Sequence, residues 1–205
     1  MTRTRWPGRK LPRSFFRRDP RLVAPELLNK IIARDDGRAG RIVEVEAYCG
    51  AEDPAAHTFR GPTKRNATMF GPPGHLYVYF TYGMHWCANT VCGEAGQGWG
   101  VLLRAIEPLA GLDAMREARG HPLKLKDIGS GPARLAQAMG ITGEQDGADL
   151  IAGDRSFRIV EDGTPPPMDP VAGPRIGISQ AKDHPWRWYV SGNPHVSGAR
   201  SPRKA

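Results

Sequence analysis

The chain has 205 residues, 40% of them hydrophobic, and it contains 25 Gly and 19 Pro. This length allows one sizeable core, and the composition favours a loop-rich globular domain over a helical bundle. No apolar run approaches the roughly 20 residues of a transmembrane helix, and the basic N-terminus lacks the apolar segment of a secretory signal. The sequence therefore predicts a protein of the cytoplasm or nucleoid (the nucleus, in a eukaryote), not secreted and not in a membrane.

The formal net charge of +8 comes from the two ends of the chain. Residues 1–18 contain seven basic residues and residues 196–205 contain three more, with no acid in either segment. Subtracting these ten from 29 leaves 19 basic residues against 21 acidic ones, so the body is slightly acidic. Basic ends commonly neutralise phosphates of nucleic acids, although arms that serve only solubility explain the same charge. We predict a disordered basic arm over residues 1–13, one domain over 14–197 and a basic tail over 198–205.

The first elements that we expect are a helix and two strands. Asp19-Pro20 predicts the start of a helix, and residues 31–33 predict a short strand that ends at the turn signal of residues 35–37. Residues 41–48 form the next strand. Alternation places Val43, Val45 and Ala47 on a core face, and it places Ile42, Glu44, Glu46 and Tyr48 on the other face. Two carboxylates beside a tyrosine suggest a strand that borders a cleft, but a half-exposed strand with solvated glutamates fits the same pattern.

Residues 49–73 follow no period and predict a long functional loop. A strand over 76–81, a tight turn at Tyr82-Gly83 and a returning strand over 84–91 predict a hairpin with an aromatic residue at its tip. A further buried strand spans 101–106, and its Arg104 must find a partner.

The second half of the chain predicts two helices and several short strands. The first helix spans 109–119, and the second begins near Ser130, its possible cap, and ends at Gly140. The free N–H groups at the start of this second helix suit an anion such as a phosphate. Strands are expected around 157–160, 175–178 and 188–190. The elements together predict a single α+β domain, mainly an antiparallel, curved and open barrel-like sheet with a protruding β-hairpin and a few flanking helices.

Several kinds of chemistry are disfavoured by the motifs. The histidines and the three cysteines show no metal-ligand spacing and no CxxC pair, so we predict no metal, no cofactor and reduced thiols. Phosphate-loop, dinucleotide and nucleophile-elbow signatures are missing from the sequence. A strand carboxylate, pocket tyrosines, a loop histidine and an aromatic hairpin tip suit an enzyme that extrudes a base from DNA. Each of these residues also has an ordinary interpretation, as sheet, loop or surface side chains.

The combination of motifs resembles the alkyladenine (3-methylpurine) DNA glycosylase family, from about Ser14 to Ser197. Each motif is weak alone, but together, in order and spacing, they are highly specific. The segments that carry the resemblance are 40–48 (GRIVEVEAY), 53–57 (DPAAH), 69–70 (MF), 74–79 (GHLYVY), 82–84 (YGM), 87–89 (CAN), 102–109 (LLRAIEPL), 130–132 (SGP), 175–177 (RIG) and 189–190 (YV).

The resemblance implies a monofunctional glycosylase, without lyase activity, that acts as a monomer on duplex DNA containing alkylated or deaminated purines. It implies that Glu46 is the general base that deprotonates the attacking water, and that Arg104 and the backbone carbonyl of Ile176 help to hold this water. It also implies a base pocket of Tyr48, His57, Tyr79 and Asn89, with Asn89 excluding the exocyclic amine of guanine. Tyr82 is implied as the intercalating residue, with DNA contacts from Thr63, Met84 and His85, and Ser130 and Gly131 are assigned to the same DNA-contacting surface.

The candidate lesions are 3-methyladenine, 7-methylguanine, hypoxanthine and ethenoadenine, and two features leave open which of them are substrates. His85 stands where some members have tyrosine, and the loop over residues 59–62 differs in length. Two other functions remain possible from the sequence. A catalytically silent module that binds damaged DNA needs the wedge and the basic ends but not Glu46, whereas a small-molecule hydrolase using Glu46 and His57 leaves the wedge idle.

Overall fold

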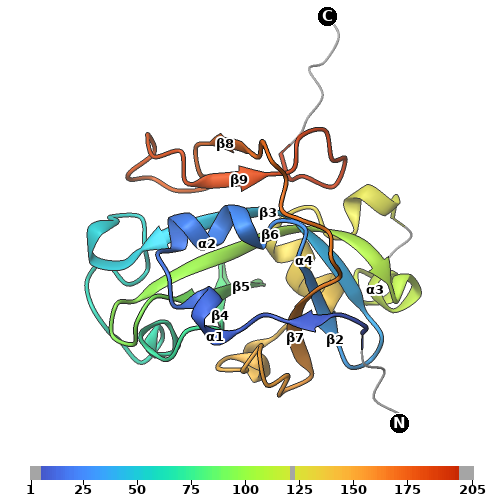
Figure 1. Ribbon diagram of the computed structural model, residues 1–205, viewed down its shortest axis with the longest axis horizontal. Coiled ribbons are helices and arrows are strands. Elements are labelled where there is room, and N and C mark those ends of the chain that lie inside the picture. The colour runs from blue at the N-terminus through green and yellow to red at the C-terminus, as the bar shows by residue number, and fades with distance from the viewer. Residues whose placement is uncertain (1–5, 121–122, 199–205) are drawn as a thin grey trace, which may run out of the picture.

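The computed structural model describes residues 6–120 and 123–198 and has the predicted α+β architecture. Its described strands form one curved antiparallel sheet of nine strands, in the order β1-β7-β2-β3-β6-β5-β4, with β9 paired to β3 and β8 paired to β9. The sheet does not close into a barrel because β1 and β4 remain at its ends (Figure 1). The strands are β1 (Arg9–Lys10), β2 (Ile31–Arg34), β3 (Ala39–Cys49), β4 (Leu76–Thr81), β5 (His85–Cys92), β6 (Trp99–Ala110), β7 (Phe157–Glu161), β8 (Val171–Gly173) and β9 (Arg187–Tyr189).

The helices are short and lie around this sheet. The α-helices are α1 (Arg13–Phe16), α2 (Pro20–Leu27), α3 (Leu112–Ala118) and α4 (Pro132–Met139). Four single-turn 3-10 helices are η1 (Gly50–Glu52), η2 (Ala67–Phe70), η3 (Leu125–Asp127) and η4 (Gly143–Gln145). The Asp19 side chain caps α2 by accepting from the Arg21 N–H at 2.7 Å, as the Asp-Pro signal predicted.

Strand β3 is the centre of the sheet. One of its edges pairs with β6 along nearly its whole length. The other edge pairs first with β2, through residues 39–41, and then with β9, through residues 44–46. The β8–β9 hairpin therefore lies over β3 although some 140 residues separate the two in the chain, as the top of Figure 1 shows. This central position fixes the backbone of β3 on both sides.

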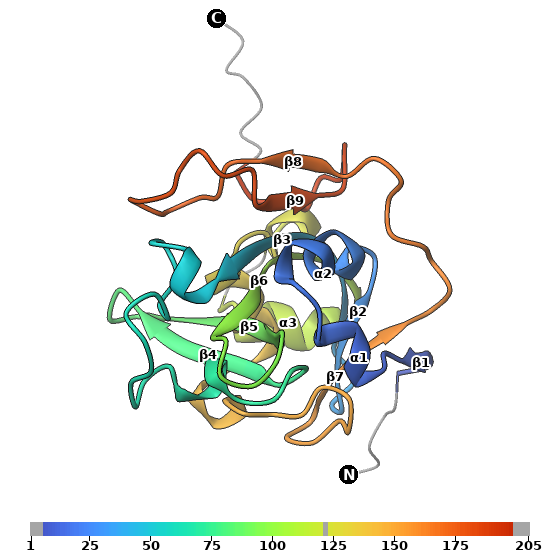
Figure 2. The same ribbon diagram turned by 60° about the vertical axis from the view of Figure 1, so that its left-hand side comes forward.

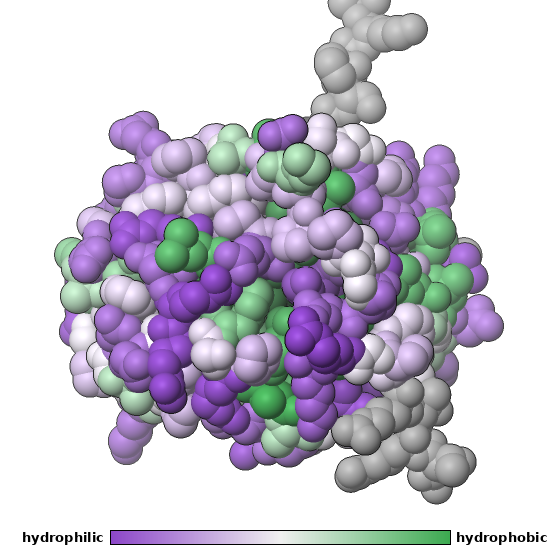
Figure 3. Space-filling model, viewed as in Figure 1, coloured by the Kyte–Doolittle hydropathy of each residue, from purple (hydrophilic) through white to green (hydrophobic). Residues whose placement is uncertain are grey.

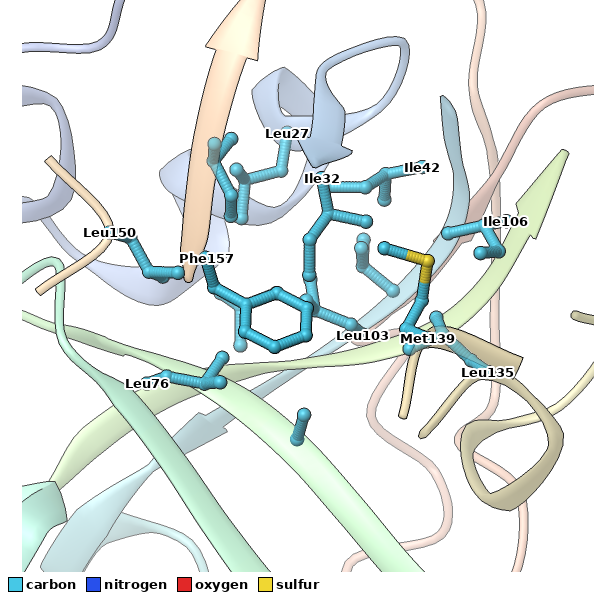
Figure 4. Close-up of a cluster of buried hydrophobic side chains, with 14 of the residues drawn as sticks. Leu27, Ile32, Ile42, Leu76, Leu103, Ile106, Leu135, Met139, Leu150 and Phe157 are labelled. Carbon is cyan, nitrogen blue, oxygen red and sulfur yellow. The ribbon is translucent and has the colours of Figure 1, made fainter. Parts of the chain in front are cut away.

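The main core fills the inner face of the curved sheet, and helices α2 and α4 close it. Figure 4 shows Phe157 and Leu150 facing the leucine and isoleucine side chains of α2, β2, β3, β6 and α4. These side chains have almost no exposed surface. The face of the molecule that Figure 3 shows is mostly hydrophilic, with hydrophobic residues in small separate areas. Most of the buried apolar side chains among the described residues belong to this core, so it supplies most of the hydrophobic driving force for folding.

A β-bulge changes the predicted facing of β3. The register with β6 shifts between Ile42 and Glu44 and again between Glu44 and Val45. Ile42 consequently packs in the main core, whereas Val43 packs outside it, against Ala105 and Val196. The prediction was therefore wrong for these two residues, because a bulge interrupts simple alternation. The shared face of Glu44, Glu46 and Tyr48 is kept.

Four further local predictions were wrong. Residues 109–110 continue β6, so α3 begins three residues later than expected, at Leu112. Gly131, without a side-chain hydrogen bond, stands at the N-cap of α4 in place of Ser130. Residues 175–178 form a loop and not a strand. The hydrogen bonds of this segment come from the Arg175 side chain and the Ile176 N–H, which bond to residues of the site, and not from a strand ladder. Part of the predicted disordered arm is folded, since Arg9–Lys10 pairs with β7 and Leu11 is buried.

The β4–β5 hairpin lies at the end of the sheet opposite β1 and β7, which Figure 2 shows most clearly. Its turn and its two strands agree with the prediction to within one residue at each end. In the part of the chain that the structure describes, no helix combines the length and apolar character needed to cross a membrane.

Candidate active site

The predicted site residues lie on the outer face of the sheet, opposite the main core. Glu46 of β3 pairs in register with Leu102 of β6, Leu102 pairs with Asn89 of β5, and Asn89 pairs with Tyr77 of β4. These four side chains form one row across four adjacent strands, because residues in register on one face of a sheet lie side by side. Arg104 lies two residues beyond Leu102 on the same face. Residues that are far apart in the sequence thus converge through strand register.

A pocket of about 430 Å³ opens over this row. Its volume falls within the range of small-molecule sites in proteins. The hairpin and β6 supply part of the lining, and the loops at 54–57 and 176–180 supply much of the rest. The lining includes Tyr48, His57, Met69, Tyr77, Tyr79, Tyr82, Cys87, Asn89, Leu102, Arg104, Pro132 and Ile176.

Glu46 lies directly behind the pocket wall and has no exposed surface. Its Oε1 accepts from the backbone N–H of Ile176 at 2.7 Å and is paired with Nη1 of Arg104 at 3.0 Å. Its Oε2 accepts from the hydroxyl of Tyr48 at 2.9 Å. All three partners line the pocket. Each carboxylate oxygen offers about two acceptor positions, so Oε2, which accepts only from Tyr48, keeps one position.

A second buried carboxylate, Glu44, holds the other side of Arg104. Its Oε1 accepts from Nε of Arg104 at 2.9 Å, Nε of Arg187 at 2.6 Å and the Ser197 hydroxyl at 2.9 Å. Its Oε2 accepts from the Ser197 backbone N–H at 2.6 Å. Nη2 of Arg104 donates to Ser197 Oγ at 3.1 Å, which completes the cluster. Two carboxylates and two guanidiniums thus balance each other's charge.

The pocket wall formed by Tyr48 rests on a buried cation. The guanidinium of Arg175 lies 4.6 Å from the centre of the Tyr48 ring and 5.1 Å from that of Trp186. Arg175 and Asp53 are both fully buried and form a bidentate ion pair, with N–O distances of 2.5 and 2.8 Å. Burial and the neighbouring Glu46 carboxylate raise the pKa of Tyr48 well above its usual value near 10. The phenol is therefore protonated and donates to Glu46.

The facing wall is aromatic. The ring of His57 meets that of Tyr79 edge-on, with centroids 4.5 Å apart, and the rings of Tyr77 and Tyr79 are stacked with centroids 5.5 Å apart. Burial raises the pKa of Tyr77 to about 12 and raises that of Tyr79 further. Partial burial, together with the charge of Arg65, lowers the pKa of His57 below 6.5. At neutral pH the wall therefore carries no charge of its own.

The tip of the hairpin projects from the mouth of the pocket. Tyr82 has 80% of its surface exposed, and Met84 has 67%. Both Tyr82 and Gly83 have positive φ values, of 51° and 66°, in a turn closed by the Met84 N–H and the Thr81 carbonyl at 3.2 Å. A bulky aromatic in this conformation is uncommon and strained. His85, at the start of β5, is also exposed.

The remaining predicted DNA contacts flank the pocket. Thr63 is exposed in the long loop, where buried Asn66 accepts from its backbone N–H at 2.6 Å and donates to the carbonyl of His57 at 3.0 Å. The same side chain thus links a predicted DNA contact to a pocket residue. Ser130 and Gly131 precede α4, next to Pro132 of the lining, and the Gly131 N–H donates to the Arg104 carbonyl at 3.0 Å.

The structure therefore brings Tyr48, His57, Tyr79, Tyr82, Asn89, Arg104 and Ile176 together around one pocket. Glu46 lies behind the wall, and Thr63, Met84, His85, Ser130 and Gly131 lie outside the lining. At Ile176 the contact to Glu46 is made by the backbone N–H, whereas the prediction assigned a role to the carbonyl. The roles of Arg187 and Ser197 were not predicted. No local motif marks them, because they reach Glu44 only through the pairing of β9 with β3.

The comparisons with known proteins give one consistent result. The family model described as "Methylpurine-DNA glycosylase (MPG)" matches residues 14–194. A protein of Burkholderia lata, described as "Putative 3-methyladenine DNA glycosylase", is 66% identical over 194 residues, covering 95% of this chain and 94% of that protein. Proteins with the same description from Agrobacterium fabrum and Carboxydothermus hydrogenoformans are 50% and 46% identical over 191 residues each. The matches cover 92% and 91% of this chain, and 92% and 98% of those proteins.

Proposed function

Because the chain belongs to the methylpurine-DNA glycosylase family and is a DNA glycosylase of base excision repair, we propose that it removes alkylated or deaminated purines from duplex DNA by hydrolysis at C1′. The candidate substrates are 3-methyladenine, 7-methylguanine, hypoxanthine and ethenoadenine. In this proposal Glu46 is the general base, the pocket receives the extruded purine, and Tyr82 fills the space that the purine leaves in the helix.

The contacts of Glu46 are the main support for this proposal. Two hydrogen bonds and one ion pair orient the carboxylate and leave one acceptor position, on Oε2, for a water molecule. Since Glu46 has no exposed surface, this water reaches Oε2 only after pocket side chains shift when the nucleotide enters. A carboxylate that is positioned in this way supplies both a proton acceptor and negative charge beside a developing oxocarbenium ion. A positioned base typically contributes about 10²–10⁴-fold to the rate.

The pocket walls suit damaged purines. Alkylation at N3 or N7 makes a purine cationic, and the faces of Tyr48 and Tyr79 attract such a base by about 0.5–2 kcal/mol. The buried amide of Asn89 lies in the same lining, which supports its proposed role in excluding the exocyclic amine of guanine. Flipping costs least for weakly paired lesions, which adds to the selectivity.

The DNA surface of the proposal surrounds the pocket. Tyr82 and Met84 at the hairpin tip, with His85, Thr63, Ser130 and Gly131, contact the duplex next to the lesion. Among the described residues, the pocket lining contains no lysine that would form a Schiff base with C1′. This composition supports a monofunctional glycosylase without lyase activity. The proposal also includes that the chain acts as a monomer, in the cytoplasm or nucleoid.

The decisive variant is Glu46→Gln, which keeps the shape of the side chain and removes the base. We expect the rate of hypoxanthine release from a duplex to fall by at least about 10²-fold. Released bases are counted as strand breaks after alkali treatment, and lesion binding is measured in parallel by a gel shift. Unchanged turnover in the variant would overturn the role of Glu46. Strand breaks before alkali treatment would overturn the absence of lyase activity.

A further inference from the structure

Buried Glu44 contacts the same guanidinium, that of Arg104, as Glu46 does. Both glutamates lie on β3 with no exposed surface, and Arg104 lies between them. The three nitrogens of the Arg104 guanidinium are divided among three different partners. Nε donates to Glu44, Nη2 donates to Ser197 Oγ, and only Nη1 is left for Glu46.

This division has a consequence for the base. A guanidinium beside a single carboxylate usually forms two parallel hydrogen bonds to its two oxygens. If Arg104 paired with Glu46 in that way, a second N–H would take the acceptor position that remains on Oε2. The carboxylate would then have no position left for water, and a full positive charge would neutralise it.

Arg187 and Ser197 fix Glu44 in turn. Arg187 donates from Nε to Glu44 at 2.6 Å and from Nη2 to the Ser197 carbonyl at 3.1 Å. The Ser197 backbone N–H donates to Oε2 of Glu44 at 2.6 Å. The last described segment of the chain is thus attached directly behind the base, by a residue of β9 and by Glu44 of β3.

We propose that Glu44 is a positioning residue, which holds Arg104 in a one-nitrogen contact with Glu46 and thereby keeps an acceptor position of the base free for water. This inference rests on the proposed role of Glu46 as the base. Arg187 balances Glu44, because it shares the charge of this carboxylate and prevents Glu44 from drawing Arg104 away from Glu46.

Substitutions of Glu44 and Arg187 should shift the pH–rate profile in opposite directions. Glu44→Gln removes a negative charge next to the Arg104–Glu46 pair. The positive charge of Arg104 then acts on Glu46 alone, so protonating Glu46 becomes harder. The acid limb of the pH–rate profile should move to lower pH by about one unit, with a reduced plateau. In Arg187→Met a positive charge is removed, and the acid limb should move to higher pH by a similar amount.

The experiment measures single-turnover release of 3-methyladenine from duplex DNA methylated with dimethyl sulfate, by chromatography, in a pH series that starts at about 3.5, below the ordinary pKa of a glutamate near 4.3, and ends at about 9. This base leaves as a neutral molecule without needing a proton, so the acid limb reports on the base. Asp35→Asn is the matched control. It also breaks a buried ion pair, with Arg158, but neither residue lines the pocket.

We expect opposite shifts in Glu44→Gln and Arg187→Met and no shift in Asp35→Asn. Equal profiles in all three variants, or shifts of the same sign in the two site variants, would overturn the positioning role. Glu46→Gln separates this failure from that of the proposed function. If Glu46→Gln is inactive while the two site variants keep the wild-type profile, only the inference about Glu44 fails. If Glu46→Gln stays active, the base assignment itself fails.

Discussion

The hydroxyl of Tyr48 donates to the candidate base, and Tyr48→Phe removes this one hydrogen bond while keeping the ring in the pocket wall. The hydroxyl donates to Oε2 of Glu46 at 2.9 Å, and it remains protonated because burial and the Glu46 carboxylate raise the pKa of Tyr48. The bond favours the charged form of Glu46 over the protonated form. Tyr48→Phe should therefore move the acid limb of the pH–rate profile to higher pH.

The size of this effect follows from the kind of bond. A hydrogen bond to a charged group contributes about 1.5–3 kcal/mol, and about 1.4 kcal/mol corresponds to one pH unit. Water that enters the vacated position replaces part of this hydrogen bond, so we expect the lower end, a shift of about one unit. Single-turnover release of 3-methyladenine from methylated duplex between about pH 3.5 and about pH 9 measures the shift. Lesion binding should change little, because the ring stays.

The same bond predicts a dependence of stability on pH. The pKa of Tyr48 is raised in the folded protein, so its contribution is present below the ordinary value near 10 and is lost as the pH rises through the raised value. The free energy of unfolding of the wild type should therefore decrease more steeply above pH 10 than that of Tyr48→Phe. If the acid limb of the pH–rate profile does not move in Tyr48→Phe and turnover at pH 5 is unaltered, the Tyr48 hydroxyl does not stabilise the charged form of Glu46.

Three other predictions concern binding and stability. Tyr82→Ser should weaken binding to lesion duplex by about 1–3 kcal/mol, the usual value of an aromatic stacking partner, with little effect on unfolding because the side chain is exposed; equal affinity for lesion DNA would contradict its wedge role. Arg175→Met should lower the free energy of unfolding in urea by about 3–5 kcal/mol, because it leaves the buried Asp53 carboxylate without its cation. The control Glu26→Gln removes an exposed ion pair and should lower the same free energy by less than about 1 kcal/mol. Deleting residues 199–205 removes three basic residues and should reduce the slope of log affinity against log salt by about 0.9 for each phosphate that the tail neutralises; an unaltered slope would mean that the tail neutralises none.

Much of the sheet could be predicted because its signals are local. The run over 76–91 is rich in aromatic and β-branched residues and has the turn Tyr82-Gly83 at its centre, so the hairpin was predicted to within a residue at each end. Strand β3 and the cap at Asp19 were found for the same reason. The start of α3 was not, because residues 109–110 suit a helix by composition but form the end of β6, where Ala110 pairs with Ala39 of β3. Pairing between distant strands decides such ends.

The candidate site divides in a similar way. The resemblance carried by the motifs together implied roles for Glu46, Tyr48, Tyr79 and Asn89, and the structure places the last three in one pocket lining with Glu46 directly behind it. The Arg175–Asp53 pair behind Tyr48 joins residues 122 positions apart. Nothing in either segment alone reveals that both side chains are fully buried. Such a contact becomes visible only when the chain has folded.

The alternation of side chains along β3 could not distinguish its two glutamates, Glu44 and Glu46. Both carboxylates are fully buried, both touch Arg104, and both lie on the same face of the strand. The bulge at Glu44 and the pairing with β9 bring Arg187 and Ser197 to Glu44, whose oxygens they occupy. Glu46 meets Tyr48 and Ile176 instead, at the edge of the pocket, and keeps an acceptor position. Glu44 is thus held by four hydrogen bonds from Arg104, Arg187 and Ser197, whereas Glu46 contacts three residues of the pocket lining, and this difference in position separates a support from a base.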